Sequence, residues 1–421
     1  MSKSNDIIKR DKKVISPSLT RESDFVFNKG KGCYVWDADN KKYLDFAAGI
    51  AVNSLGYGNK DILNAVKKQL NYGLHIGFGD FYTEKPVEFA EELLKHAPKH
   101  LNNVFLSNSG TESVEAAYKL ARWHTKKKWV IAFKNSFHGR TMGSLSMTNT
   151  KKVQRERFDP FLPVKHAPYP DVFRFKGSKN ECVNFCLNEL EKTISSLKKD
   201  TAAVFMEPIQ GEGGYIVPPR EFVKGVREIC DKHNVLLAVD EVQSGCYRTG
   251  KFLAIENYNV KPDIVCLSKA LGGGLPLGAT LANKEIMDWV PGSHNNTFGG
   301  NLLACSSGTA FLRYCRKKEI WNNATNVGSY IMKKLNKMKM DYEHIGDVRG
   351  IGLMIGVDFV DNKRNKNHNS KLRNKVVYKC KEHGLIVLPA GESVIRFCPP
   401  LILSRKEADF GLKIFEKSLI D

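Results

Sequence analysis

The sequence predicts an α/β protein with a mostly parallel central sheet and a second, smaller α+β domain. Two observations lead to this prediction. Between about residues 100 and 310, short continuous apolar runs alternate with segments of helical spacing, which is typical of buried parallel strands joined by helices. After about residue 310 the alternation stops, and helical segments lead into short strands near residues 353–360, 385–388 and 394–397.

Changes in this pattern predict where the domains begin and end. Residues 1–25 are polar, and we expect a flexible arm there. Residues 26–65 contain a strand–turn–strand pattern over 33–46 and then helical spacing, and we assign them to the small domain. The large domain then spans residues 66–310, and residues 311–421 complete the small domain.

The charge does not predict a nucleic-acid-binding protein. The chain has 65 Lys and Arg against 45 Asp and Glu, a formal net charge of +20. Basic pairs are spread along the whole chain, without interleaved aromatic residues or a zinc-finger spacing. We therefore expect a solvated basic surface and no nucleic-acid partner, with the excess charge favouring acidic small molecules near the site.

The cysteines and the apolar runs indicate whether the protein binds a metal, spans a membrane or belongs to an oxidising compartment. The ten cysteines are scattered without a CxxC pair, which disfavours a zinc site and predicts no bound metal. Unpatterned cysteines in a large chain are typical of reduced core residues. No apolar run approaches the roughly 20 residues of a membrane span, and the N-terminal residues lack the apolar stretch of a signal peptide. A cytoplasmic protein without a membrane partner is expected.

Reactive or polar side chains follow the apolar runs of the central region. Because ligands of open α/β sheets bind at the carboxyl ends of the strands, these side chains are expected to share one site. Lys269 follows the run 264–267 after a single serine, Ser268, and precedes a group of glycines. A lysine buried there loses proton affinity and becomes a nucleophile toward carbonyl groups. A surface lysine beside a turn is the alternative.

Asp240 follows the apolar run 235–239, 29 residues before Lys269. Pyridoxal 5′-phosphate (PLP) chemistry needs a lysine for the imine and a carboxylate that keeps the ring nitrogen protonated. Lys269 and Asp240 would supply both groups. A structural aspartate that caps the next helix is the alternative.

Ser109 to Glu112 have the pattern of a helix start, with Ser109 as the N-cap and Glu112 at the capping-box position. A phosphate would bind the exposed amides of Gly110 and Thr111, favoured by the helix dipole. A helix cap without a ligand is the alternative.

Two further segments follow strands. In FHGR, Phe137 would stack on a flat cofactor and Arg140 would bind a carboxylate in a bidentate manner, whereas a core phenylalanine and a surface arginine are equally compatible with the pattern. Glu207 and Glu212 in EPIQGEGG could be paired catalytic carboxylates. No cluster of sugar-binding aromatic residues surrounds them, which disfavours a glycosidase.

Glycine-rich patterns do not indicate a nucleotide site. The chain has no GxxxxGK[ST], which disfavours a P-loop NTPase. The segment GIGLMIG from Gly350 has the spacing GxGxxxG, and the residues after it alternate like a strand. We predict a turn and a strand there rather than a dinucleotide loop.

With these residues in view, the chain resembles the class-III PLP-dependent aminotransferases of fold type I, which include the 4-aminobutyrate, ornithine and acetylornithine enzymes. The likeness runs from about residue 33 to the C-terminus. Its most specific stretches are AAVFMEPIQGEGGYIVPP, VLLAVDEVQSG, RTGKF, PDIVCLSKALGGGLPLGA and NNTFGGN, in that order. The C-terminal SVIRFCPPLILSRKEADFGLKIFEKSL and the segment GSHNNTFGGN are similar to the archaeal branch, which includes ω-aminotransferases and amino-acid racemases.

The resemblance implies a role for each residue of the cofactor site. Lys269 would be the lysine that binds PLP covalently and later moves the substrate proton. Asp240 would pair with the ring nitrogen and Gln243 would bond the ring hydroxyl, with Glu207 supporting the site from behind. The remaining cofactor contacts would be Gly110 and Thr111 at the phosphate, Phe137 and His138 beside the ring, and Thr297, which reaches the phosphate of the other subunit's site.

The resemblance also implies how substrates bind. Arg140 and Arg396 match carboxylate-binding arginines, and Glu212 would neutralise Arg396 for an ω-amino substrate and release it for 2-oxoglutarate. Ile50 stands where ornithine enzymes carry tyrosine and 4-aminobutyrate enzymes carry isoleucine, which favours 4-aminobutyrate-like substrates. Two segments depart from the family: GYGNK replaces GHxHP, and IGFGDFY contains Asp80, which would attract a substrate ammonium or lie in a surface loop.

We therefore predict an aminotransferase that moves an amino group from an ω-amino acid, 4-aminobutyrate-like or ornithine-like, to 2-oxoglutarate. An amino-acid racemase that uses the same lysine and cofactor is one alternative, and a non-enzymatic basic binding scaffold is another. Family members are dimers with sites at the subunit interface, so the resemblance implies a homodimer or a higher homo-oligomer.

Overall fold

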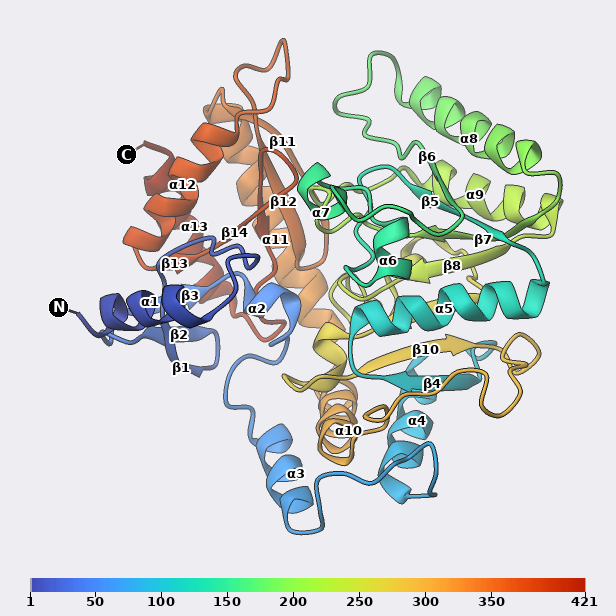
Figure 1. Cartoon of the computed structure of the whole chain (residues 1–421). Coiled ribbons are helices and arrows are strands. Elements are labelled where there is room, and N and C mark those ends of the chain that lie inside the picture. The colour runs from blue at the N-terminus through green and yellow to red at the C-terminus, as the bar shows by residue number, and fades with distance from the viewer. Residues whose placement is uncertain (1, 421) are drawn as a thin grey trace.

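The computed structural model describes residues 2–420 and contains one large sheet and two small ones (Figure 1). The large sheet has the strand order β4-β10-β9-β8-β7-β5-β6. Its strands are β4 (Asn103–Ser107), β5 (Trp129–Phe133), β6 (Val164–Ala167), β7 (Thr201–Met206), β8 (Leu236–Asp240), β9 (Ile264–Leu267) and β10 (Gly278–Ala282). Neighbours pair in parallel except at β10, which is antiparallel to both β4 and β9. The predicted α/β fold with a mostly parallel central sheet is confirmed.

Strands β6 and β10 are not predicted by the apolar runs, because their sequences VKHA and GATLA are short and dominated by small or polar residues. The antiparallel strand β10 determines the direction of β4. Since it is antiparallel to both neighbours, β4 runs in the same direction as β9. The carboxyl ends of β4, β5, β7, β8 and β9 therefore lie at one edge of the sheet, as expected for a shared site.

Helices cover both faces of this sheet (Figure 1), and the buried side chains divide between the faces by alternation along each strand. Along β8, Ala238 packs in the cluster that includes Val114 and Ala117 of helix α5 (Gly110–Thr125). Leu237 and Val239 pack on the opposite face, in the cluster of α8 (Lys179–Ser196) and α9 (Arg220–His233). The helices of the large-sheet region are α3 (Lys60–Leu70), α4 (Glu84–His96), α5 (Gly110–Thr125), α6 (Met142–Met147), α7 (Lys152–Arg155), α8 (Lys179–Ser196), α9 (Arg220–His233) and α10 (Leu302–Lys317), with short 3₁₀ turns η1 (Ala254–Tyr258) and η2 (Lys269–Gly272).

One of the two small sheets joins the N-terminal and C-terminal parts of the chain, and the other consists of C-terminal strands. One has the order β1-β2-β3-β13 and the other β11-β12-β15-β14. Their strands are β1 (Phe27–Lys31), β2 (Tyr34–Asp37), β3 (Lys42–Asp45), β11 (Ile345–Ile351), β12 (Met354–Phe359), β13 (Leu385–Ile386), β14 (Leu388–Ala390) and β15 (Val394–Phe397). The turn and strand predicted at Gly350 are the β11–β12 hairpin. The proposed domain boundaries near residues 65 and 310 stay predictions.

Five helices accompany the small sheets: α1 (Lys3–Val14), α2 (Ala48–Ala51), α11 (Ile320–Asp341), α12 (Ser370–Glu382) and α13 (Arg405–Ile420). Helix α1 is not predicted by the sequence, because the segment is polar and none of its residues is buried. Its start is tied to the β2–β3 turn, where Lys3 N donates to Asp39 Oδ1 at 2.9 Å.

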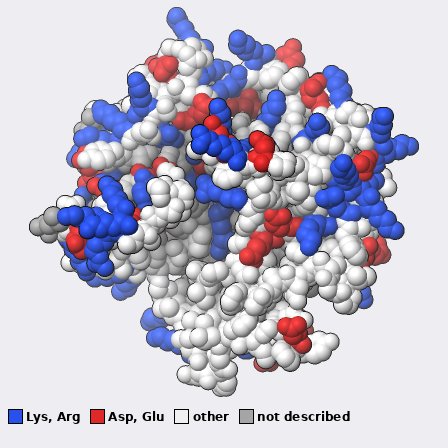
Figure 2. All heavy atoms as spheres, viewed as in Figure 1, with Lys and Arg blue, Asp and Glu red and all other residues white. Residues whose placement is uncertain are grey.

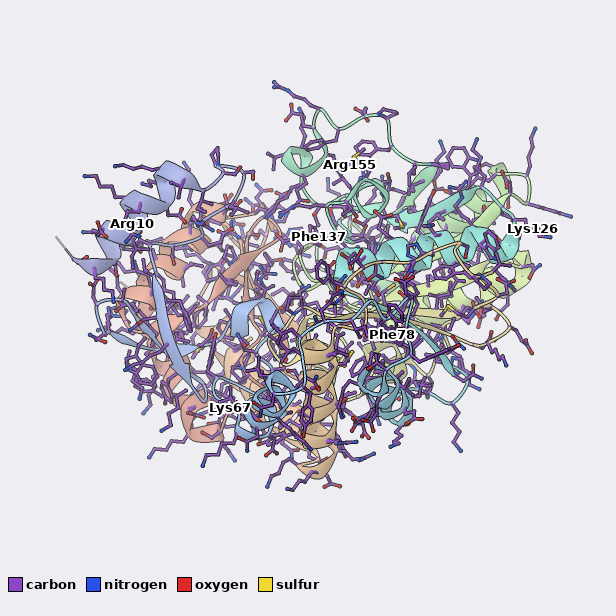
Figure 3. The ribbon with its side chains drawn as sticks, turned by 60° about the horizontal axis from the view of Figure 1, so that its bottom comes forward. Arg10, Lys67, Phe78, Lys126, Phe137 and Arg155 are labelled. Atoms are coloured by element: carbon purple, nitrogen blue, oxygen red, sulfur yellow. The ribbon has the colours of Figure 1, made fainter. Side chains whose placement is uncertain are left out.

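The surface carries the excess positive charge in a dispersed form. Figure 2 shows lysines and arginines spread around the rim of the molecule, and Figure 3 places Arg10, Lys67 and Lys126 at its periphery. Among the described residues, no helix combines the length and the apolar character that crossing a membrane requires. All ten cysteines are buried and unbridged, and residues 2–420 hold no cluster of three or more potential metal ligands.

Candidate active site

A cavity of about 300 Å³ lies at the carboxyl edge of the large sheet. Figure 3 shows Phe137, which borders it, near the middle of the molecule between α5 and the small sheets. Residues at or after the carboxyl ends of five strands, β4, β5, β7, β8 and β9, meet in this cavity, as the sequence predicts. Its lining residues are Gly110, Thr111, Phe137, His138, Gly139, Arg140, Glu207, Asp240, Val242, Gln243 and Lys269.

Lys269 is the first residue of the turn η2, one residue after the end of β9, and has a left-handed conformation with φ of 42°. Ser268 fixes the start of this turn, because its hydroxyl donates to Leu277 O at 2.8 Å. Burial lowers the pKa of Lys269; Asp240 opposes this effect, and Arg396 adds to it. A lysine with a lowered pKa has more of the neutral amine that attacks a carbonyl carbon. Lys269 is half-buried and lines the cavity, which disfavours the surface-lysine alternative.

Asp240 ends β8 and lies buried on the cavity wall. Its Oδ2 is 2.8 Å from His138 Nδ1, and its Oδ1 accepts from Val242 N at 3.0 Å. Burial lowers the pKa of His138, but the hydrogen bond and charge of Asp240 outweigh burial, so the pKa is raised overall. The sequence places both residues in the site but does not predict their contact. His138 Nε2 is buried without a hydrogen-bond partner among the described residues.

The start of α5 is a ready anion site. Ser109 caps the helix by accepting from Glu112 N at 3.3 Å, as predicted. The capping box is not closed, because Glu112 instead accepts from Asn108 N at 2.6 Å. The amides of Gly110 and Thr111 begin a helix of 16 residues, whose dipole favours a negative group at this end.

Hydroxyl groups surround the same helix start. Thr111 Oγ1 lies 2.6 Å from Ser144 Oγ and 2.8 Å from Thr141 Oγ1. Gly139 is required beside them, because its φ is 138° and a Cβ would lie 2.3 Å from Thr111 Oγ1. Hydroxyls and free amides converging on one point are what a phosphate group needs.

Glu207 joins two loops of the cavity through its ionisable side chain. Its Oε1 accepts from Phe137 N at 2.9 Å and its Oε2 accepts from Gly211 N at 2.8 Å. Burial raises the pKa of Glu207 to about 7, with the charge of His138 acting against this rise. Glu207 is thus placed to position the aromatic ring of Phe137.

Glu212 lies between two cations just outside this lining. Arg396 Nη1 donates to Glu212 Oε2 at 3.2 Å, and Lys151 Nζ donates to Glu212 Oε1 at 2.8 Å. Burial raises the pKa of Glu212, but Arg396 and Lys151 outweigh burial and the pKa is lowered overall. The Glu212–Arg396 pair is expected from the sequence. Lys151 is not, because no local signal marks a lysine 61 residues away as its partner.

The other expected site residues lie around the cavity or away from it. Arg140 stacks on Phe137, with the guanidinium carbon 5.6 Å from the ring centroid. Gln243 Oε1 accepts from the hydroxyl of the buried Tyr215 at 2.8 Å. Thr297 and Asp80 are exposed and do not line the cavity.

Ile50 is also outside the lining and is 41% exposed. Its φ of 60° is left-handed, as are those of Ala48, Gly49 and Ala51. A β-branched residue is strained in this conformation. Strain of this kind is typical of sites where a side chain must be presented in one orientation.

The cavity fits PLP on its own chemistry. It combines an amine with a lowered pKa, a buried carboxylate, an aromatic ring and a helix N-terminus lined with hydroxyls. These groups match an aldehyde, a ring nitrogen, a flat ring and a phosphate, respectively.

Comparison with known proteins settles the family. The family model described as "Aminotransferase class-III" matches residues 17–419. The chain belongs to the class-III aminotransferases. An acetylornithine aminotransferase from Clostridium acetobutylicum is 41% identical over 402 residues, covering 93% of this chain and 96% of that protein. A leucine/methionine racemase from Thermococcus litoralis is 37% identical, covering 99% of this chain and 95% of that protein.

Solved structures agree with this assignment. The ornithine aminotransferase from Toxoplasma gondii ME49 superposes with a TM-score of 0.89 at 29% identity, covering 100% of this chain and 96% of that one. A PLP-bound amine transaminase from an uncultivated Pseudomonas species gives a TM-score of 0.90 at 28% identity, covering 97% of both chains. The protein is therefore a PLP-dependent enzyme of fold type I.

Proposed function

We propose that this aminotransferase moves an amino group from an ω-amino acid to 2-oxoglutarate. The observation that carries the proposal is the ion pair between Glu212 and Arg396, at 3.2 Å. In this pair the positive charge of Arg396 is neutralised, which suits a donor whose reacting end has no carboxylate. When Glu212 turns away, Arg396 is free to bind the second carboxylate of 2-oxoglutarate.

Bound PLP supplies an electron sink that withdraws charge from the substrate carbon bearing nitrogen. The chain's own groups do the rest. Lys269 has the lowered pKa that suits an amine for taking and returning a proton at that carbon. The buried carboxylate of Asp240, oriented by His138, would hold a proton on the ring nitrogen. Gly110 and Thr111 would bind the phosphate, Phe137 would cover the ring and Arg140 would bind a substrate carboxylate.

Two observations favour different ω-amino acids as the amino donor. Relatives of this chain are named acetylornithine aminotransferases, at 41% and 43% identity for two of them, which supports an ornithine-type donor. Ile50 supports a 4-aminobutyrate-like donor, because it stands where 4-aminobutyrate enzymes carry isoleucine and ornithine enzymes carry tyrosine. A panel of 4-aminobutyrate, ornithine, acetylornithine, lysine and alanine, each with 2-oxoglutarate, tests the proposal through glutamate formation. Turnover with alanine alone would overturn it.

Amino-acid racemisation is the second candidate, because proteins named leucine/methionine racemase and alanine/serine racemase are 37% and 34% identical to this chain. Racemisation needs the proton to return to the opposite face of Cα. The holoenzyme is incubated with an L-amino acid and no oxo-acid. Complete loss of optical activity, without glutamate-coupled turnover in the donor panel, would replace the aminotransferase proposal by this one.

A homodimer is part of the proposal. Apolar side chains are exposed around α3 and α4, in the largely uncharged lower part of Figure 2, beside a groove of about 760 Å³. These residues are Leu70, Tyr72, Leu74, Phe81, Tyr82 and, near Thr297, Phe298. Large exposed apolar patches are typical of interfaces, and Thr297 would reach the partner's site from this face. A monomer by light scattering would contradict it. A cytoplasmic location and the absence of a nucleic-acid partner stay predictions.

A further inference from the structure

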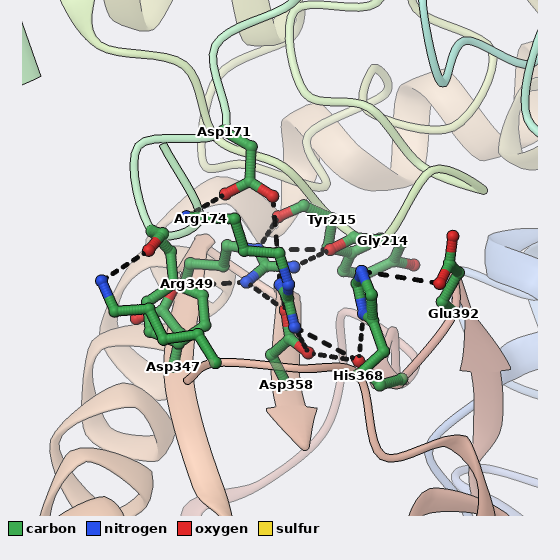
Figure 4. A network of polar contacts seen from close by, with 12 residues as sticks. Asp171, Arg174, Gly214, Tyr215, Asp347, Arg349, Asp358, His368 and Glu392 are labelled. Atoms are coloured by element: carbon green, nitrogen blue, oxygen red, sulfur yellow. Dashed lines mark hydrogen bonds and ion pairs between the residues drawn. The ribbon is translucent and has the colours of Figure 1, made fainter. Parts of the chain in front are cut away.

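A buried network of ion pairs and hydrogen bonds connects the loop that carries Glu212 to the strand that carries Arg396 (Figure 4). Its central group is the carboxylate of Asp358 on β12, which is 0% exposed. Asp358 accepts from Arg174 Nη2 at 2.9 Å, from Arg349 Nη1 at 2.9 Å and from Ser393 Oγ at 2.7 Å.

Arg349 is the member of the network that reaches the loop. Its Nη2 donates to Gly214 O at 2.7 Å, and its Nε donates to Gly214 O at 3.2 Å and to Tyr215 O at 3.1 Å. Gly214 and Tyr215 follow Glu212 by two and three residues and both have positive φ. The forked guanidinium thus binds the outer carbonyls of a tight turn whose inner side is closed by hydrogen bonds from Gly214 N and Tyr215 N to Gly211 O.

The other end of the network fixes the strand. Ser393, bonded to Asp358, directly precedes β15, in which Arg396 lies, and Gly391 N donates to Glu212 O at 2.8 Å. Both backbones that carry the Glu212–Arg396 pair are therefore held by the same group of residues. With the backbones fixed, Glu212 can leave Arg396 only by rotating its side chain.

We infer that Arg349 is a positioning residue that sets the closed state of the Glu212–Arg396 pair, and hence the choice between one-carboxylate and two-carboxylate substrates. The inference rests on the proposed function of that pair. Without Arg349 the turn moves, Glu212 loses its preset position and Arg396 is less often neutralised. Ligands that need a neutral partner then bind more weakly, whereas ligands with a second carboxylate do not.

The test measures binding rather than turnover. Dissociation constants of butyrate and glutarate, two unreactive carboxylates, are measured for the PLP-loaded enzyme by calorimetry. We expect Arg349→Met to weaken butyrate binding relative to glutarate by about fivefold, near the net contribution of one ordinary hydrogen bond, because Arg349 acts on the ligand only through Glu212. The visible absorbance of the bound cofactor is expected to stay unchanged, because Arg349 does not line the cavity.

Arg174→Met is the matched control. Arg174 also pairs with Asp358, but its hydrogen bonds do not reach the turn at Gly214 and Tyr215. This variant should lose stability and keep the butyrate-to-glutarate ratio. Should Arg349→Met not fold, Arg349→Lys carries the test, because lysine can pair with Asp358 but lacks the fork that spans two carbonyls.

Different variants test the positioning role of Arg349 and the proposed function of the Glu212–Arg396 pair. An unchanged ratio in both Arg349 variants, or the same shift in Arg174→Met, would overturn the positioning role. Arg396→Met tests the pair itself. If that variant binds glutarate as well as the unaltered enzyme does, the proposed function of the pair fails.

Discussion

Replacing Asp358 by asparagine is predicted to destabilise the protein by about 3–5 kcal/mol, because two guanidinium groups then lose a buried counter-ion. Asp358 is the shared acceptor of Arg174 and Arg349, whose side chains are only 17% and 11% exposed. The entropy of unfolding expected for 421 residues converts this loss into a melting temperature lower by about 3–6 °C.

The stabilisation by Asp358 should decrease as the pH falls. Burial raises the pKa of Asp358, but hydrogen bonding by Arg174 and the charges of Arg349 and Arg174 outweigh it and lower the pKa from 3.8 to about 2. A carboxyl group with a lowered folded-state pKa binds more protons when unfolded. Its stabilisation, about 2 kcal/mol, is therefore present above pH 3.8 and is lost as the pH falls through about 2.

The assay compares thermal unfolding of PLP-loaded Asp358→Asn with the unaltered enzyme between pH 7 and pH 3. The difference between the two should be constant from pH 7 to pH 5 and shrink only below about pH 4. Asp171→Asn is the control, because Asp171 Oδ2 lies 3.9 Å from Arg174 and is partly exposed, so its loss should cost little. A difference under about 1 kcal/mol at pH 7, or one that does not change in acid, would refute the reasoning.

Three further predictions concern the site. Borohydride reduction of the holoenzyme should leave a permanent adduct on the peptide containing Lys269, and an adduct on another peptide would contradict the assignment. Asp240→Asn should lower turnover by about 10- to 100-fold in steady-state assays, the value of one charge-assisted hydrogen bond; unchanged turnover would remove Asp240 from the mechanism. Lys151→Met should leave Glu212 paired with Arg396 alone, so that Glu212 releases Arg396 less readily and 2-oxoglutarate binding weakens by about fivefold. Lys152→Met, at an exposed position, is the control and should leave binding unchanged. Equal effects of the two substitutions would refute the role of Lys151.

The parts of the site that the sequence predicts are those marked by local pattern. Lys269 and Asp240 each follow a continuous apolar run, and such runs are typical of parallel strands that are buried on both faces. Once the strands are parallel, their carboxyl ends meet at one edge. The helix cap at Ser109 is equally local, since a hydroxyl before a helical segment satisfies a free amide.

The parts that the sequence does not predict depend on contacts between distant segments. Arg349 bonds Gly214 across 135 residues, and nothing near Arg349 distinguishes it from a surface arginine. The left-handed turn at Ile50 is set by its surroundings, including Asp45, whose carboxylate accepts from Ala47 N and Ala48 N. Propensity alone disfavours that conformation for isoleucine, so tertiary contacts determine it.

Glu207 should make both stability and activity depend on pH, because its two hydrogen bonds need both carboxylate oxygens as acceptors. Its pKa, raised by burial to about 7 from 4.5, means that the folded protein keeps a proton that the unfolded chain releases. Stability should therefore fall as the pH rises from about 4.5 to about 7, while the ionised form, which accepts best from Phe137 N and Gly211 N, gains population.

Activity should accordingly rise through about pH 7 as these two loops are fixed. In Glu207→Gln one of the two backbone amides faces an NH₂ group, which costs about 1–3 kcal/mol and removes a titrating group. Turnover of this variant should be low and should lack the rise near pH 7, when measured from pH 5.5 to pH 9 with saturating PLP. A variant that keeps the same rise would show that another group titrates there, and that Glu207 holds the loops without linking them to pH.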